Sequence, residues 1–132
     1  MTNIDRLSAE VADAMLDALP LEISFVDDQD TVRYFNKMLK RDIFQRPPTT
    51  IGKMVQLCHP EKSLEKVLKI LRDFKSGARD SADFWIDFRE RKVLIRYFAV
   101  RDRSGKYLGC LETSQDITAW KNIEGEKRLD SE

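Results

Sequence analysis

The side chains best suited to chemistry in this chain are two cysteines, one histidine and a few polar groups set among apolar strand residues. Cys58 and His59 are adjacent, and His59 is the only histidine. Imidazole is a standard axial ligand of haem, and a thiolate at a helix N-terminus has a lowered pKa that suits redox sensing or soft-metal binding. His59 and Cys58 are therefore the candidate haem or metal ligands. One histidine and two cysteines cannot complete a four-ligand zinc site without carboxylates, which disfavours zinc.

Motifs that would indicate an enzyme are missing from the sequence. It contains no Gly-rich phosphate loop, no HExxH and no GxSxG, and the single histidine has no evident Ser or Cys partner in a triad. We therefore expect no enzymatic activity.

A helix is predicted immediately after His59. Pro60 suits the first helical position, Glu61 favours the positive helix end, and Gly77 is placed to close the helix. The apolar residues between them recur every three or four positions and form one face: Leu64, Val67, Leu68, Leu71 and Phe74. This face must be covered, and a β-sheet is the expected cover.

The strands of that sheet are predicted on both sides of the helix. Two runs rich in β-branched and aromatic residues flank the polar residues 27–30, which indicates a hairpin over residues 22–35. Residues 82–88, 92–102 and 106–116 read as three further strands joined by short polar loops. The sequence thus predicts an α+β fold with a five-stranded antiparallel sheet, helices on one face and an N-terminal amphipathic helix flanking the other.

Strand alternation assigns side chains to an inward face. If Glu90 and Arg91 form the tight loop, Phe88 lies opposite Val93. The candidate ligand pocket then comprises Phe84, Ile86, Phe88, Val93, Ile95, Tyr97, Cys110, Glu112 and Ser114. We give equal weight to the alternative that Glu112 turns to solvent or pairs with an arginine. We also favour the aromatic residues as core and interface over a cofactor site.

The outward face is predicted to be apolar as well, with Trp85, Leu94 and Phe98 around Arg96. The first helix, over residues 4–19, carries an apolar stripe that can cover this face in its own chain or in a second copy. The expected dimer or helix-packing face is Leu7, Val11, Met15, Trp85, Leu94, Arg96 and Phe98. For Arg96 we favour a side chain that extends from beneath the helix to bring its charged head to solvent, or that pairs with Asp13 or Asp17, over a role in anion binding.

Composition limits the class of protein. The chain has 132 residues, 23 basic and 23 acidic side chains and 42% hydrophobic residues, which describes one globular domain without a basic surplus for nucleic acid. No apolar run is long enough to cross a bilayer. We therefore expect a cytoplasmic protein that binds neither nucleic acid nor membrane. We divide it into a flanking helix at 1–20, a domain at 21–119 and a helical tail at 120–132, with short helical turns between residues 36 and 54.

Three segments together resemble a PAS sensor domain. RDRSGKYLGCLETSQDIT, from Arg101 to Thr118, is similar to the last PAS strands with their turn and terminal Asp-Ile-Thr. VDDQDTVRYFN, ending at Asn36, resembles the first PAS hairpin, and HPEKS resembles the start of the long PAS helix. The resemblance covers about residues 21–119. A narrower likeness is to the C-terminal PAS module behind hemerythrin-like domains of bacterial and archaeal proteins.

The resemblance implies a sensory function. Such a module is expected to bind a small ligand or cofactor in its core and to relay the change through its flanking helices, or through a homodimer, to other domains of a longer protein. The alternatives are a ligand-free homodimerisation module and a haem sensor that uses His59. Because many PAS domains have this histidine without haem, we favour helix capping and packing for His59, and a buried apolar role for Cys58. The chain lacks the Asn-Cys-Arg-Phe sequence of photoactive flavin-binding members, which disfavours flavin adduct chemistry. The cofactor, if any, is left open.

Overall fold

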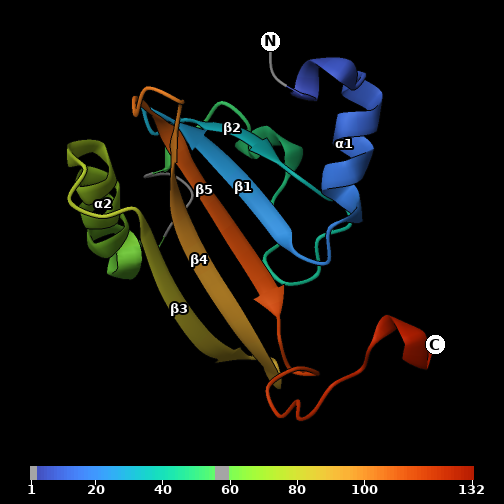
Figure 1. The fold of residues 1–132 in the computed structure, drawn as a ribbon. Coiled ribbons are helices and arrows are strands. Elements are labelled where there is room, and N and C mark those ends of the chain that lie inside the picture. Colours follow the sequence, from blue (N-terminus) through green and yellow to red (C-terminus); the bar gives the residue numbers. More distant parts are fainter. Residues whose placement is uncertain (1–2, 56–59) are drawn as a thin grey trace.

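The computed structural model describes residues 3–55 and 60–132, and its centre is one antiparallel sheet (Figure 1). The sheet has five strands in the order β2-β1-β5-β4-β3. They are β1 (Glu22–Asp27), β2 (Val32–Phe35), β3 (Ser81–Phe88), β4 (Arg91–Arg101) and β5 (Tyr107–Asp116). The predicted fold class and the first hairpin are confirmed. The first and last strands of the chain lie side by side at the middle of the sheet.

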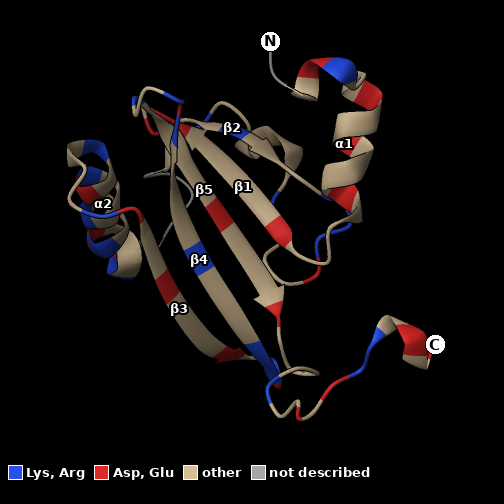
Figure 2. Ribbon diagram, viewed as in Figure 1, with Lys and Arg blue, Asp and Glu red and all other residues tan. Residues whose placement is uncertain are grey.

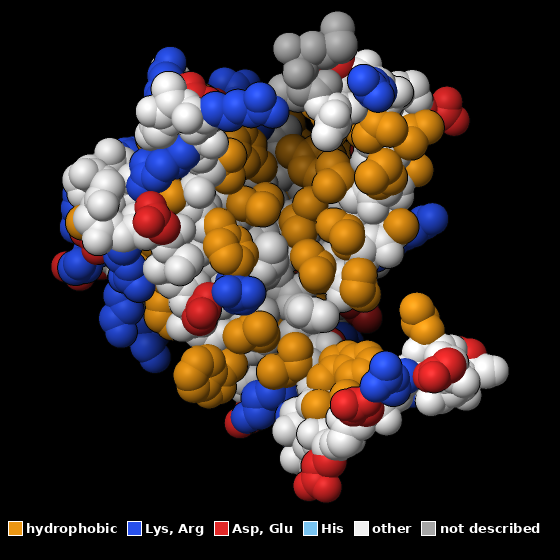
Figure 3. Space-filling view, in the orientation of Figure 1, with side chains coloured by type: hydrophobic (Ala, Val, Ile, Leu, Met, Phe, Trp, Pro, Cys, Tyr) orange, Lys and Arg blue, Asp and Glu red, His pale blue; other side chains and the backbone are white. Residues whose placement is uncertain are grey.

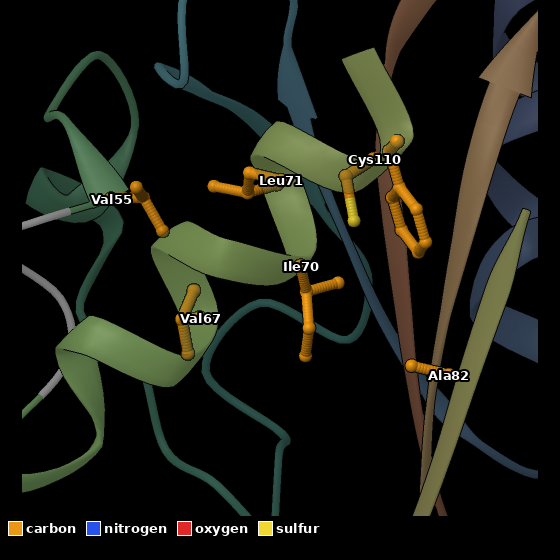
Figure 4. Close-up of a cluster of buried hydrophobic side chains, with 7 residues drawn as sticks. Val55, Val67, Ile70, Leu71, Ala82 and Cys110 are labelled. Atoms are coloured by element: carbon orange, nitrogen blue, oxygen red, sulfur yellow. The ribbon is translucent and has the colours of Figure 1, made fainter. Parts of the chain in front are cut away.

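Helix α2 (Glu61–Ser76) covers one face of this sheet, here called the inner face. It follows Pro60 and ends at Gly77, whose φ of 81° is the left-handed conformation that glycine adopts without strain. Its buried side chains are Val67, Ile70, Leu71 and Phe74, which form one core cluster with Val55, Ala82 and Cys110 (Figure 4). The predicted apolar face of the helix and its cover by a sheet are confirmed.

Helix α1 (Ala9–Ala18) lies beside the β1–β2 edge, across the sheet from α2 (Figure 1). Ser8 begins it, because the Ser8 hydroxyl accepts a hydrogen bond of 3.1 Å from the Val11 amide. A short 3-10 turn at Asn3–Arg6 precedes it. The helix has no buried residue, so its apolar stripe is left exposed in the single chain.

The β3–β4 turn differs from the prediction by one position. Arg89 and Glu90 form the turn with φ of 50° and 64°, the positive values that a two-residue hairpin turn of the favoured hand requires. Phe88 therefore pairs with Arg91, not with Val93, and Ile86 pairs with Val93. The register is shifted by two residues, which leaves every side chain on the face that alternation assigned to it.

The C-terminal segment is not the helix that was predicted. Residues 120–128 form turns and extended chain, and only Leu129–Ser131 make a short 3-10 turn. Gly125 lies in the middle of the segment with a positive φ of 66°, and the surrounding side chains are exposed. A short helix interrupted by glycine and without a packing surface is not stable in water.

Charged side chains concentrate on α2 and on the loops, whereas the strands are mostly uncharged (Figure 2). Residues 36–54 form turns and one 3-10 helix at Pro48–Thr50, as expected from the paired prolines. This segment brings Arg41 and Arg46 against the inner side of the sheet, where each meets a carboxylate. It thereby supplies the polar groups of the cleft described below.

Candidate ligand-binding cleft

A cleft of ≈ 720 Å³ lies between α2, the inner face of strands β3 to β5 and residues 43–46. Such a volume is within the range of small-molecule sites in proteins. Its walls are mainly apolar, and Phe44 and Phe88 pair there with ring centroids 5.4 Å apart. The cleft is lined by Ile43, Phe44, Gln45, Arg46, Pro60, Ser63, Val67, Ile86, Phe88, Arg89, Ile95, Tyr97 and Glu112.

Three polar side chains meet at the inner end of the cleft. Arg46 Nη2 lies 3.1 Å from Glu112 Oε1, and the two side chains are only 14% and 13% exposed. Tyr97 is the cross-strand neighbour of Glu112, and burial together with the Glu112 charge raises the pKa of Tyr97 far above its usual value. Tyr97 is therefore a neutral phenol at physiological pH, and Glu112 accepts a hydrogen bond from Arg46.

A second, small cavity of ≈ 30 Å³ lies behind this polar group. It shares Arg46, Tyr97 and Glu112 with the cleft and is also lined by Ser24 and Cys110. Burial, with a further contribution from the Glu112 charge, raises the pKa of the Cys110 thiol to about 12. Cys110 is a free thiol that stays protonated at neutral pH, so here it is a packing residue and not a nucleophile.

A second arginine–carboxylate pair supports the loop that carries Arg46. Arg41 Nε lies 3.3 Å from Glu22 Oε1, and both side chains are almost fully buried. Glu22 also accepts hydrogen bonds of 2.8 to 2.9 Å from the backbone amides of Asp42, Ile43 and Phe44. Burial alone would raise the pKa of Glu22, but these amides and Arg41 outweigh it and lower the pKa. Glu22 thus fixes residues 41–44 against β1 as a charged anchor.

Asn36 connects β1 to helix α1. Its side chain is fully buried; Oδ1 accepts a 2.7 Å hydrogen bond from the Ile23 amide, and Nδ2 donates to the carbonyls of Leu16 and Leu21 at 2.9 and 3.0 Å. Asp17 adds a 2.9 Å bond from the Lys37 amide. The end of α1 is therefore joined by hydrogen bonds to the strand that follows it.

The structure brings five of the nine residues predicted for the pocket to the cleft. Ile86, Phe88, Ile95, Tyr97 and Glu112 line it, and Cys110 lines the small cavity with Tyr97 and Glu112. Phe84, Val93 and Ser114 share the inner face but lie outside both linings. Phe84 is half-exposed and meets Tyr97 edge-on, with ring centroids 6.1 Å apart.

For Glu112, the alternative of pairing with an arginine is the one observed, and the partner is Arg46. Sequence reasoning gave no role to Arg41 or Arg46, since a buried arginine has no periodic signal. Asn36 was noted only as the residue after the first hairpin, and its three side-chain hydrogen bonds were not foreseen.

On the outer face, apolar side chains gather over the sheet and on the adjoining side of α1 (Figure 3). Trp85 is 67% exposed and Leu94 and Phe98 are partly exposed, so α1 of the same chain does not enclose them. Arg96 pairs with Asp83 at 2.8 Å and its guanidinium lies 4.7 Å from the centroid of the Phe98 ring. The expected partners Asp13 and Asp17 were wrong, because the cross-strand neighbour on β3 is closer.

Cys58 and His59 lie outside the residues that the structure describes, so haem ligation and helix capping by His59 both stay predictions. Within the described ranges, no group of three or more His, Cys, Asp or Glu side chains is placed to hold a metal ion. Likewise, no helix among the described residues is both long and apolar enough to pass through a bilayer.

Comparison with known proteins identifies the fold family. The family model described as PAS domain matches residues 12–118. A C-terminal domain from Streptococcus mutans, known as a crystal structure, is 38% identical with a TM-score of 0.83, over 89% of this chain and 91% of that one. A sensory box sensor histidine kinase from Vibrio cholerae is 16% identical with a TM-score of 0.58, over 88% and 96%.

The PAS domain of BvgS from Bordetella pertussis is 17% identical with a TM-score of 0.61, over 83% of this chain and 85% of that one. No curated protein matches the sequence. The likeness to hemerythrin-linked modules stays a prediction. PAS domains in general serve sensing and not catalysis. With the family match spanning residues 12–118 and the sheet order, long helix and inner cleft in place, this chain belongs to the PAS domain family.

Proposed function

We propose that this domain is a sensory module that binds a small molecule in the cleft beside Arg46, Tyr97 and Glu112 and is not an enzyme. The observation that carries the proposal is the cleft of ≈ 720 Å³, which holds the Arg46–Glu112 pair with side chains only 14% and 13% exposed. A few polar groups placed among apolar walls in this way fix the orientation of a bound small molecule. The apolar walls of the cleft give such a ligand its contact area.

The route from the cleft to α1 follows contacts between charged and polar groups. The Arg46 charge acts on Arg41, whose pKa is lowered mainly by burial and further by Arg46. Arg41 pairs with Glu22 at the start of β1, and the next residue, Ile23, donates to Asn36, which holds the end of α1. A ligand that draws Arg46 from Glu112 therefore changes the balance of charge at the strand to which α1 is attached. Ligand binding acts through unequal affinity for two arrangements of this network.

Native mass spectrometry after incubation with a deproteinised cell extract tests ligand binding. We expect a one-to-one small-molecule adduct in the natural protein. Ser63→Trp, on the cleft wall, should abolish it by filling the space, whereas the matched control Lys62→Trp, on the exposed side of the same helix, should keep it. An adduct unaffected by Ser63→Trp, or no adduct with any extract, would contradict the proposal. Faster hydrogen exchange in α1 on binding is the expected sign of the relay.

A second function, homodimerisation, is supported by two exposed apolar surfaces of the same chain. The apolar stripe comprises Val11 and Met15 of α1 and Leu7, which lies just before the helix; Leu7, Val11 and Met15 are 37%, 46% and 54% exposed. The outer sheet face around Trp85 and Phe98 is also open. Contiguous exposed apolar area of this kind marks interaction sites, and a two-fold arrangement lets each helix cover the other chain's sheet.

Sedimentation velocity over a range of concentrations tests the dimer. We expect a concentration-dependent dimer that Val11→Asp and Trp85→Asp each weaken, while the control Asp13→Asn on another side of α1 leaves it intact. A monomer at every concentration would rule this function out.

We place the protein in the cytoplasm, with further domains of a longer chain as partners; the free thiol of Cys110 supports a reducing compartment.

A further inference from the structure

The side chains that form the floor of the cleft follow one another along the sheet. They are Phe88, Ile86, Ile95 and Tyr97, from strands β3 and β4. The register of these strands places them, in that order, at four successive inner-face levels that are two residues apart. The floor from Phe88 to Tyr97 therefore extends over six residues of strand, which is roughly 20 Å at the usual rise of a strand. The cleft is thus long, and its two ends differ.

The end of the cleft at Tyr97 holds a pair of charges that cancel. Arg46 Nη2 lies 3.1 Å from Glu112 Oε1, and both side chains are mostly buried. Tyr97, the cross-strand neighbour of Glu112, stays an uncharged phenol because its pKa is raised. A ligand anion placed here would bring a second negative charge beside Glu112 in a site with little water, which is unfavourable. This end therefore suits an uncharged part of a ligand.

The opposite end of the cleft carries an arginine without a carboxylate partner. Arg89 lies in the β3–β4 turn, lines the cleft and is exposed. Its guanidinium lies over the Phe88 ring, 5.0 Å from the centroid, and no carboxylate of the described residues pairs with it. Stacking uses the face of the guanidinium and leaves its N–H groups, which lie in the plane, available to an anion. This end therefore suits a carboxylate.

Apolar walls connect the two ends of the cleft. Phe44 meets Phe88 beside Arg89, with ring centroids 5.4 Å apart. At the other end, Val67 of α2 lines both the cleft and the small cavity that it shares with Tyr97. A ligand that spans the distance between these ends must therefore be apolar over most of its length.

Building on the proposed function, we propose that the cleft binds a straight-chain monocarboxylate, a fatty acid of medium chain length. Its carboxylate pairs with Arg89 at the turn, and its alkyl chain lies along Ile86 and Ile95 toward Tyr97. The alkyl chain supplies most of the affinity, because each methylene group taken out of water contributes. The ion pair with an exposed arginine adds less and selects the headgroup.

Isothermal titration calorimetry with straight-chain probes tests this ligand class. The probes are hexanoate, octanoate and decanoate, with octanol as the uncharged analogue of octanoate. We expect the affinity to rise about fourfold for each added methylene group. Octanoate should bind about threefold more tightly than octanol. Arg89→Asn, which suits the positive φ of the turn, should remove this preference, whereas the control Arg103→Asn, in the exposed β4–β5 turn, should keep it.

Two further variants locate the bound chain. Ser63→Trp fills the cleft and should abolish decanoate binding. Trp85→Ala removes the most exposed aromatic side chain of the outer sheet face and should leave decanoate binding unchanged. Binding that is lost in Trp85→Ala and kept in Ser63→Trp would place the chain on the outer face and overturn the proposal.

The outcomes separate the ligand class from the sensory function. Failure of every carboxylate to bind, affinity that does not change with chain length, or equal binding of octanoate and octanol would overturn the fatty-acid class. In each case, an extract adduct that Ser63→Trp abolishes would still support a sensor that binds another ligand in the cleft. Absence of any extract adduct as well would overturn the function. Because the chain-length and headgroup comparisons use the natural protein, they do not depend on how well a variant folds.

Discussion

Replacing Asn36 by alanine removes the side chain that joins β1 to α1. Three hydrogen bonds are lost, to the Ile23 amide and to the carbonyls of Leu16 and Leu21, in a position from which water is excluded. At about 1 kcal/mol for each bond, and more where a buried group is left unpaired, we expect the free energy of unfolding to fall by about 2–4 kcal/mol. At ~4 °C per kcal/mol for a domain of this size, the melting temperature should fall by roughly 8–16 °C.

Urea unfolding followed by circular dichroism measures this loss. Asn122→Ala is the matched control, since Asn122 is exposed and its replacement should change stability by less than about 0.5 kcal/mol. Hydrogen exchange should also show faster exchange at the Ile23 amide and in the last turn of α1. A loss below about 1 kcal/mol relative to the control would refute the argument, because it would mean that these buried groups find other partners at little cost.

Three further predictions follow from the same structure. Gly109→Ala should destabilise the domain by about 3 kcal/mol by thermal unfolding, more than Gly105→Ala does. A Cβ at residue 109 would overlap the Val26 carbonyl oxygen, whereas no atom lies within 4 Å of a Cβ at residue 105; equal losses would contradict this. In a variant whose other cysteine is replaced by serine, Cys110 should react with a disulfide reagent at pH 8 only as fast as the domain unfolds, because the pKa of the Cys110 thiol is about 12. Rapid reaction of the folded protein would contradict this. The folded-state pKa of Glu22 lies below its unfolded value of 4.5, so the stabilisation by the charged carboxylate is present above pH 4.5 and is lost as pH falls through the folded pKa. Melting temperatures should therefore show that Glu22→Gln is less stable than the natural protein at pH 7. On acidification to pH 3, the variant should lose less stability than the natural protein does.

Local patterns were sufficient for the strands and for α2. Alternation in β3 and β4 assigned Phe84, Ile86 and Tyr97 to one face, and that assignment survived a mistaken turn because a shift of two residues restores the same alternation. The turn itself was missed because Arg89 and Glu90 are not the usual residues at positive φ. The tail after Trp120 was overpredicted, since helix propensity says nothing about whether a packing surface exists.

The polar part of the cleft could not be predicted in the same way. Glu112 was assigned to the inner face by alternation, but its partner Arg46 is 66 positions earlier, in a segment without periodicity. The burial of Arg41 depends on Glu22, which is likewise distant in sequence. Such pairings arise only when the fold brings the segments together, and no local pattern records them.

The central position of β1 and β5 has a mechanical consequence. Glu22, the first residue of β1, pairs with Ser114 near the end of β5, so the chain enters and leaves the sheet at the same end of one antiparallel strand pair. A pulling force applied through the two flanking segments would load the hydrogen bonds between these strands one after another, as in opening a zipper, and not all together as in shear. The domain is thus built to yield to low tension applied through these two segments, starting at the end of β1 where Glu22 and the Asn36 contact lie.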